Sequence, residues 1–232
     1  EGNHDLPRLF SVLKEDVGLT KMALAYVLTM PRVPQLYYGT EVLMTSPTVR
    51  DDGKARQDFP GGWAGDKVDA FTGKGLSAKQ KDMQTFVRTL LNWRKTQTTV
   101  HHGKLMHFVP QGGTYAWFRY DADSTVMVVI NKNRTETELD LARFREVLKT
   151  PATARDVIAG ALIGLLSSYA YTRAQPQGVG AVMPAATAGA YGMGITTSCW
   201  PRLAWSSPSE KRGQYPFCQG QRHPLILAKK GY

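Results

Sequence analysis

The residues with the clearest capacity for chemistry lie at the start of the sequence, where Asn3, His4 and Asp5 follow one another directly. A carboxylate accepts hydrogen bonds from two hydroxyl groups, and an imidazole donates or accepts one more. Polar contacts that strengthen as a bound substrate changes shape toward its transition state lower the reaction barrier and not only the energy of the ground state. Taken alone, this tripeptide before a Leu-Pro pair is also an ordinary turn composition.

Two regular elements are predicted directly after this tripeptide. Apolar residues recur at helical spacing from Leu19 to Met30, and Pro31 ends the helix because proline cannot continue the hydrogen-bond ladder. The stretch VPQLYYGTE, residues 33–41, is short, apolar and aromatic up to Gly39. It predicts a buried strand that ends in a turn.

A long loop is predicted over residues 44–75, which are polar and rich in Gly and Pro. Loops of this length in compact domains are usually functional or disordered. The embedded aromatic residues Phe59, Trp63 and Phe71 favour a packed, functional loop.

A second helix is predicted over residues 78–95. Ser77 and Gln80 have the spacing of a capping box, in which each side chain accepts a free backbone N–H. The order helix, buried strand, loop, helix is typical of an α/β barrel or a doubly wound sheet.

The pattern changes near residues 98–103. Short strand-like runs follow, separated by the turn sequences PQGG, DADS and KNR, and they predict the start of an antiparallel β domain. Trp117 and Phe118 alternate on one strand, so one is expected in the core and the other at an interface. From residue 161 the sequence has no helical or strand period.

The charge distribution is uneven. The net charge is +10, but residues 161–232 hold seven Lys and Arg against one acid, Glu210. This composition leaves open a basic nucleic-acid or surface-binding module, although its members form no helix face and no known motif. They are Arg173, Arg202, Lys211, Arg212, Arg222, Lys229 and Lys230, with Trp200, Trp205 and Tyr215.

Other classes of site find little support. Cys199 and Cys218 have neither metal-ligand spacing nor a disulfide framework, and His101 with His102 lacks a third ligand at a set spacing. The longest apolar stretch, residues 157–171, is shorter than the roughly 20 residues of a membrane-spanning helix.

Several motifs together resemble one family. GNHDLPR, VPQLYYGTE, RQDFPGGWAGD, LLNWRK and HHGKLMHF occur in this order within residues 1–160, and they resemble the alpha-amylase family of glycoside hydrolases, of the neopullulanase and starch-utilisation amylase type. The resemblance implies the end of a (β/α)8 TIM barrel over residues 1–100, a partial all-β sandwich over residues 101–160 and an irregular tail over residues 161–232.

The same resemblance implies roles for the opening residues. Retaining glycosidases use a nucleophile and an acid/base about 5 Å apart. The family adds a third carboxylate that stabilises the transition state, which is Asp5 here, and His4 and Asn3 would contact the same sugar. The family's nucleophile and acid/base belong to barrel strands four and five, so this chain is expected to be inactive alone.

Further expectations concern the loop and the partners. Arg56 is interpreted either as an outer sugar contact or as a loop salt bridge, and Trp63 either as a sugar-stacking ring or as a loop anchor. Tyr37 and Tyr38 are interpreted as barrel packing. The implied partner is an α-glucan, without nucleic acid. No cofactor is expected, although the intact parent could hold calcium, and the implied location is periplasmic or extracellular.

The origin of residues 161–232 has one more interpretation. The predicted β domain breaks off, and a segment of unlike composition replaces its closing strands, as a reading-frame shift would produce. A sandwich that lacks strands would expose sheet edges and apolar faces, which favours aggregation.

Overall fold

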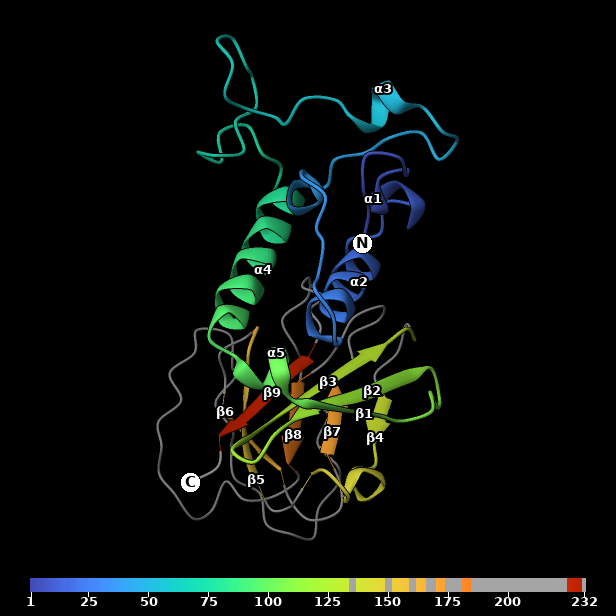
Figure 1. The fold of residues 1–232 in the computed structure, drawn as a ribbon, viewed down its shortest axis with the longest axis vertical. Helices are drawn as coiled ribbons and strands as arrows, with labels where there is room; N and C mark the ends of the chain where they lie inside the picture. Colours follow the sequence, from blue (N-terminus) through green and yellow to red (C-terminus); the bar gives the residue numbers. More distant parts are fainter. Residues whose placement is uncertain are drawn as a thin grey trace, which may run out of the picture. The chain divides into compact units, whose positions relative to one another are not determined.

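The computed structural model describes residues 1–133, 137–148, 152–158, 162–165, 170–173, 181–184 and 225–230. Residues 1–185 and 222–232 form one compact unit, and a second unit, 186–221, lies outside the described residues. Helices come first along the chain and strands follow (Figure 1). The helical elements up to residue 102 are α1 (Leu9–Val12), α2 (Val17–Thr29), the 3-10 helix η1 (Thr40–Val42), α3 (Asp52–Ala55), α4 (Ala78–Lys95) and α5 (Thr98–His102).

Both long helices confirm the prediction. Helix α2 begins where the Asp16 carboxylate accepts the Leu19 N–H at 3.0 Å, and it ends just before Pro31. Helix α4 begins with the capping box, since Ser77 Oγ accepts the Gln80 N–H and the Gln80 side chain accepts the Ser77 N–H. Local side-chain chemistry therefore fixes where each helix starts.

The buried strand predicted over residues 33–39 is wrong. The structure assigns no strand there, and Val33 is 93% exposed. A strand needs a neighbouring strand to pair its backbone groups, and the described residues place none beside this segment. The predicted turn is confirmed, because Gly39 has a φ of 83°, and a Cβ added there would lie 2.0 Å from the Met44 sulfur.

The antiparallel β domain is confirmed from residue 104 onward. One sheet has the order β1 (Lys104–His107), β2 (Thr114–Tyr120), β3 (Ser124–Asn131), β9 (Leu225–Lys230), β5 (Ala152–Asp156) and β6 (Leu162–Leu165). A second sheet has the order β4 (Thr137–Leu139), β7 (Ala170–Arg173) and β8 (Ala181–Pro184). The 3-10 helix η2 (Leu141–Phe144) follows β4.

The prediction of an irregular tail needs correction for its described segments. All of them are strands: β6, β7, β8 and β9. Strand β9 lies between β3 and β5 and pairs antiparallel with both. The edge of β3 that faces away from β2 is therefore covered by β9. The separation of domains at residue 100 stays a prediction.

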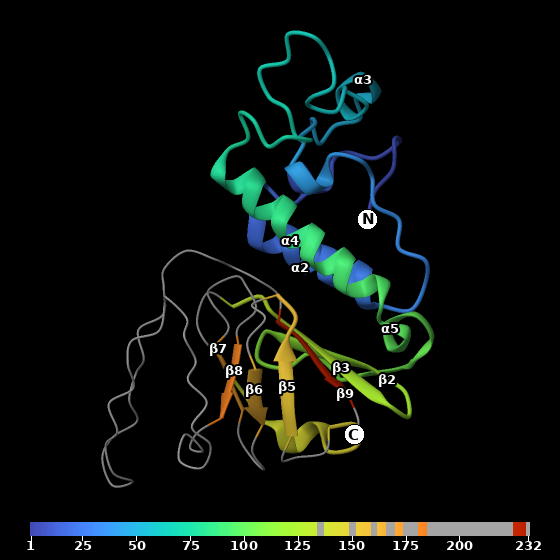
Figure 2. The same ribbon diagram turned by 90° about the vertical axis from the view of Figure 1, so that its left-hand side faces the viewer.

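Strand β2 separates two hydrophobic cores. Phe118 packs with Met127 and Phe144 on one face, whereas Trp117 packs with residues of α2 and α4 on the other. Both side chains are fully buried, so Phe118 is the expected core residue and Trp117 lies at the contact between helices and sheet. Helices α2 and α4 run side by side next to the sheet (Figure 2).

Polar contacts hold the C-terminal end of α2 to this sheet. The Trp117 indole N–H donates to Thr29 Oγ1 at 3.1 Å, and the Arg119 guanidinium donates to the Thr29 carbonyl at 3.1 Å. Arg94 of α4 donates to the Leu28 carbonyl at 2.8 Å. These guanidinium groups satisfy carbonyls that a helix end leaves without partners. Burial lowers the pKa of both Arg119 and Arg94.

The loop over residues 44–75 is confirmed as long, and it contains only the short helix α3. It is packed only in part, since two of its aromatic side chains, Trp63 and Phe71, are 70% and 74% exposed. Val42, Met44, Ala70 and Leu76 form a small core of their own beneath it. Phe59 packs against Phe71 with ring centroids 5.1 Å apart. This packing gives the loop a defined course, on which its polar side chains can be positioned.

Candidate functional site

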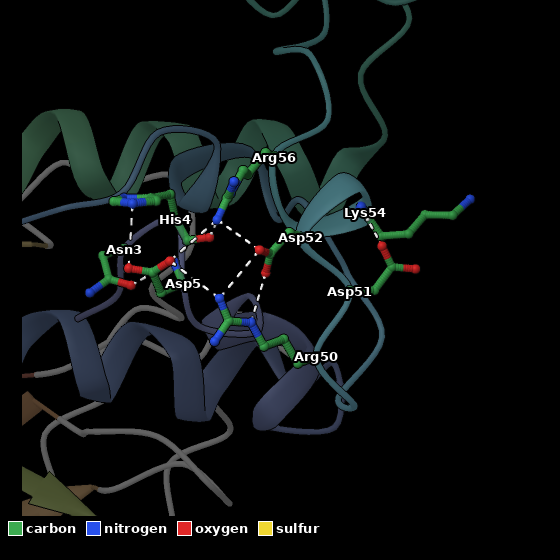
Figure 3. Close-up of polar contacts among 8 residues, drawn as sticks. All are labelled: Asn3, His4, Asp5, Arg50, Asp51, Asp52, Lys54 and Arg56. Atoms are coloured by element: carbon green, nitrogen blue, oxygen red, sulfur yellow. Dashed lines mark hydrogen bonds and ion pairs between the residues drawn. The ribbon is translucent and has the colours of Figure 1, made fainter.

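The tip formed by Asn3, His4 and Asp5 is a closed turn. Asn3 Oδ1 accepts the Asp5 backbone N–H at 2.8 Å, which fixes the carboxylate next to the imidazole. His4 Nε2 lies 3.3 Å from Asp5 Oδ2 (Figure 3). The two side chains are 63% and 48% exposed, so both can meet a ligand from solvent.

The other carboxylate oxygen of Asp5 faces the loop. Arg56 Nη2 lies 3.2 Å from Asp5 Oδ1, and Arg56 Nε donates to the His4 carbonyl at 3.0 Å. Arg50 Nη2 lies 3.7 Å from the same Oδ1. Residues about fifty positions apart in the sequence thus meet at one carboxylate, as Figure 3 shows.

Asp52 joins the two arginines. Its carboxylate lies 3.0 Å from Arg50 Nε and 2.9 Å from Arg56 Nη2. Helix α3 positions it, because Asp51 caps that helix by accepting the Lys54 N–H at 3.0 Å. The hydrogen bond from Arg50 holds the pKa of Asp52 below its ordinary value, and the same bond raises the pKa of Arg50.

The tip is anchored on both sides to residues 35–46. Glu1 Oε1 accepts the Tyr37 N–H at 2.7 Å and the Thr40 hydroxyl at 2.9 Å. On the other side the Arg8 N–H donates to Ser46 Oγ at 2.9 Å, and the Arg8 guanidinium donates to the Tyr38 carbonyl. The turn is therefore held from both ends, although its own side chains stay exposed.

The predicted site residues divide into two groups. Asn3, His4, Asp5 and Arg56 meet in one cluster, and the contacts of Arg56 bear out its interpretation as a loop salt bridge. Trp63 is not brought into this cluster: its N–H donates to Asp66 Oδ2 at 3.1 Å, and it is 70% exposed. Its interpretation as a sugar-stacking ring stays a prediction.

Sequence reasoning missed Arg50, Glu1 and Arg8. The run Arg-Asp-Asp-Gly at residues 50–53 contains Asp51, which caps α3. This capping residue is the sequence signal that could have identified the neighbouring Arg50 as part of the site. Glu1 and Arg8 flank the tip directly, but their partners lie more than thirty positions away. Tyr37 and Tyr38 pack on the Arg8 guanidinium, in line with a packing role.

Within the part of the chain that the structure describes, no group of three or more His, Cys, Asp or Glu residues is arranged to hold a metal ion. His101 and His102 lie on α5, between the last long helix and the first strand, with their rings 5.9 Å apart. Their place is the junction that the sequence predicts.

Most residues of the rival nucleic-acid hypothesis lie outside what the structure describes. Arg173, Lys229 and Lys230 belong to strands β7 and β9, but only their backbone is described. The remaining members fall on undescribed residues. No contact within the described residues favours this hypothesis over the first.

Comparisons with known proteins give a consistent result. Residues 105–175 match the family model "Cyclo-malto-dextrinase C-terminal domain". The chain is 25% identical over 142 residues to the cyclomaltodextrinase of Geobacillus thermopakistaniensis (strain MAS1), which covers 60% of this chain and 21% of the relative. It is also 25% identical over 145 residues to the maltogenic alpha-amylase of Bacillus acidopullulyticus, covering 61% and 22%. The chain thus spans about a fifth of these curated relatives.

Solved structures show a similar fold. The alpha-amylase of Geobacillus thermoleovorans, complexed with acarbose, superposes with a TM-score of 0.56 at 19% identity, over 72% of this chain and 34% of that one. AmyP in complex with maltose superposes with a TM-score of 0.61 at 19% identity, over 80% and 41%. At such identities the likeness concerns the fold alone.

The resemblance seen in the sequence is confirmed as a resemblance: residues 105–175 match the C-terminal domain of cyclo-malto-dextrinases, and the chain is similar to alpha-amylase family glycoside hydrolases. Within that family it is similar to cyclomaltodextrinases and maltogenic amylases. In the described part of the chain, none of the helices has both the length and the apolar character needed to cross a membrane.

Proposed function

We propose that this chain forms part of a retaining glycoside hydrolase that acts on α-glucans such as starch, maltooligosaccharides, pullulan or cyclodextrins. The observation that carries the proposal is the exposed Asp5–His4 pair on a turn closed by Asn3, with a 3.3 Å contact between the two side chains. The relatives support the substrate class, because one is named a cyclomaltodextrinase and the other a maltogenic alpha-amylase.

In this proposal Asp5 stabilises the transition state and does not attack the sugar. Its Oδ2 faces His4, and its Oδ1 faces Arg56 and Arg50. A sugar with two adjacent hydroxyl groups would donate to the carboxylate, while His4 contacts the same ring. Contacts that tighten as the ring flattens toward an oxocarbenium ion lower the barrier.

The pairing with Arg56 has a consequence for substrate binding. Oδ1 is already shared between guanidinium groups, so an arriving hydroxyl has to exchange with one of them or bind beside it. Because all partners are exposed, this exchange costs little free energy. Arg56 would keep its contacts to Asp52 and to the His4 carbonyl, and the N–H released from Asp5 would donate to an outer sugar, which joins its two interpretations.

We further propose that the chain alone does not hydrolyse α-glucans. The resemblance assigns the nucleophile and the acid/base to barrel strands that the printed sequence does not include. In this proposal Asp5 and His4 form one part of a catalytic set, and the resemblance assigns its other two carboxylates to barrel strands four and five.

The experiment that tests both parts uses the purified chain. Incubation with maltooligosaccharides, pullulan and cyclodextrin is expected to release no product, and clear turnover would refute the inactivity of the chain. In parallel, NMR titration with maltotriose is expected to shift the backbone amides of His4, Asp5 and Arg56. The Asp5→Asn variant should weaken these shifts severalfold, whereas Asp123→Asn, at an exposed residue outside the cluster, should not. Equal shifts in both variants would remove Asp5 from the site.

A further inference from the structure

Arg8 is a buried cation whose charge the described residues do not balance. Its side chain is only 2% exposed, although Arg is almost never fully buried without a partner of opposite charge. Nη1 donates to the Tyr38 carbonyl, but Nε and Nη2 have no hydrogen-bond partner among the described residues. No described carboxylate lies within 4.0 Å of this guanidinium.

The aromatic neighbours do not supply the missing anion. The Arg8 Cζ atom lies 4.3 Å from the ring centroid of Tyr37 and 4.5 Å from that of Tyr38. Such cation–π contacts stabilise the charge in part but accept no N–H bond in the guanidinium plane. Burial raises the pKa of Tyr37, so its phenol is neutral at pH 7 and provides no counter-charge.

The unsatisfied atoms define the chemistry of the partner. Nε and Nη2 lie along one edge of the planar guanidinium, and their two N–H groups point in parallel, at the spacing of the two oxygens of a carboxylate. A halide is spherical and offers no pair of acceptor oxygens, whereas a carboxylate accepts both N–H bonds at once. We propose that this edge of Arg8 is a carboxylate-binding site, filled either by the side chain of another polypeptide segment or by a small free carboxylate.

The place of the site gives it a consequence. Arg8 lies three positions after Asp5. Its backbone N–H bonds Ser46 and its guanidinium bonds the Tyr38 carbonyl, next to Tyr37, which is bonded by Glu1 at the other end of the tip. A carboxylate bound at Nε and Nη2 would fix the guanidinium against Tyr37 and Tyr38 and thereby the turn that carries Asp5. The binding itself does not depend on whether Asp5 contacts a sugar.

The test follows the Nε–H signals of arginine in ¹⁵N-correlated NMR spectra at pH 7 and constant ionic strength. Sodium acetate replaces sodium chloride stepwise. One Nε–H signal is expected to shift along a saturating curve, and this signal should be missing in Arg8→Lys, which keeps the charge but has no guanidinium. The matched variant Arg88→Lys, at an exposed position of α4, should keep the saturating signal.

A second measurement covers the case in which Arg8→Lys does not fold. A ligand that binds only the folded chain raises the thermal midpoint in step with its occupancy. The midpoint of the unaltered chain should therefore rise with acetate along the same saturation curve. A linear shift of the same size in chloride and acetate, or a saturating signal that persists in folded Arg8→Lys, overturns the proposal.

The affinity distinguishes the two sources. Half-saturation at low millimolar acetate indicates a free small carboxylate. Half-saturation only at much higher acetate, with selectivity over chloride retained, indicates a side-chain carboxylate, because a tethered group reaches its site at a high effective concentration. Activity on α-glucans plays no part in either readout, so failure here leaves the proposed function untouched.

Discussion

The two oxygens of the Asp5 carboxylate face different partners, and this difference is the main feature of the candidate site. Oδ2 faces an imidazole, and Oδ1 faces two guanidinium groups that Asp52 holds together. All these side chains are partly exposed, where ion pairs contribute little to stability. The cluster therefore serves to orient the carboxylate more than to stabilise the fold.

The protonation of Asp52 should report the integrity of this cluster. Its pKa is depressed by the Arg50 hydrogen bond, so the native state holds the charged form more tightly than the unfolded chain does. The resulting stabilisation is fully present above pH 3.8, the ordinary value, and is lost as pH falls through the lowered pKa. A carboxyl ¹³C NMR titration is expected to give a midpoint for Asp52 below 3.8.

Two variants check the cause of this shift. Arg50→Gln removes the hydrogen bond and should move the Asp52 midpoint upward, while Arg88→Gln on α4 should leave it in place. A wild-type midpoint at or above 3.8, or no response to Arg50→Gln, would contradict the ion network.

Only part of this site could be predicted from the sequence. Asn3, His4 and Asp5 are adjacent, so a turn brings them together whatever the remaining fold is. Arg50 meets Asp5 only because the loop over residues 44–75 takes a particular course, which involves contacts outside the loop such as the hydrogen bond from the Tyr38 hydroxyl to the Gln57 carbonyl. Spacing along the chain carries no signal for such a contact.

Among the elements, α4 owes its start to two side chains. Ser77→Ala removes the acceptor for the Gln80 N–H and should lower the free energy of unfolding by about 0.5–2 kcal/mol, measured by urea denaturation. Ser77→Asp keeps a capping oxygen and should retain most of the stability. If Ser77→Asp destabilises the chain as much as Ser77→Ala, the cap is not the cause.

One buried hydroxyl contributes to the attachment of α2 to the sheet. Thr29 Oγ1 accepts the Trp117 indole N–H and donates to the Ala25 carbonyl at 2.6 Å. Thr29→Val keeps the shape but leaves the indole N–H without an acceptor, which should cost about 1–3 kcal/mol in thermal or urea unfolding.

A matched variant separates this effect from the general loss of a threonine hydroxyl in a helix. Thr85 Oγ1 of α4 also donates to the carbonyl four residues earlier, at 2.8 Å, but it is exposed. Thr85→Val should change stability by less than about 0.5 kcal/mol. Similar losses in Thr29→Val and Thr85→Val would show that the indole contact contributes nothing.

The elements also show where prediction from sequence succeeds. Helices α2 and α4 were predicted because caps and apolar periodicity act within a few residues. Strands β2 and β3 were predicted because turn residues separate them and they pair with each other along the chain. The wrong strand over residues 33–39 has the composition of a strand, but a sheet forms only with partners, which composition does not reveal.

For the whole molecule, the position of β9 has the largest consequence. This strand comes from the end of the chain and lies between β3 and β5, so it joins the first half of the six-stranded sheet to the second. The pairing of β3 with β9 joins residues about a hundred positions apart and closes a long loop, which costs conformational entropy. Neither the composition of residues 161–232 nor their lack of a period indicated it.

Leu227 offers a direct test, because it pairs with Met127 of β3 and with Asp156 of β5. Leu227→Pro removes a backbone N–H from a strand with neighbours on both sides, where proline is not tolerated. The lost ladder bond should lower the free energy of unfolding by about 1–3 kcal/mol or more. Hydrogen exchange should then show weaker protection of the β3 amides at residues 126–128.

Leu227→Val keeps the N–H and should preserve that protection, so the two variants separate backbone pairing from the loss of a side chain. If Leu227→Pro leaves the β3 amides as protected as in the unaltered chain, the end of the chain does not complete the sheet. The unlike composition of residues 161–232 would then favour the reading-frame hypothesis, which translation of the alternative frames of the coding DNA can check. Protection lost in Leu227→Pro alone would show instead that this segment, whatever its origin, supplies the central strand on which both halves of the sheet depend.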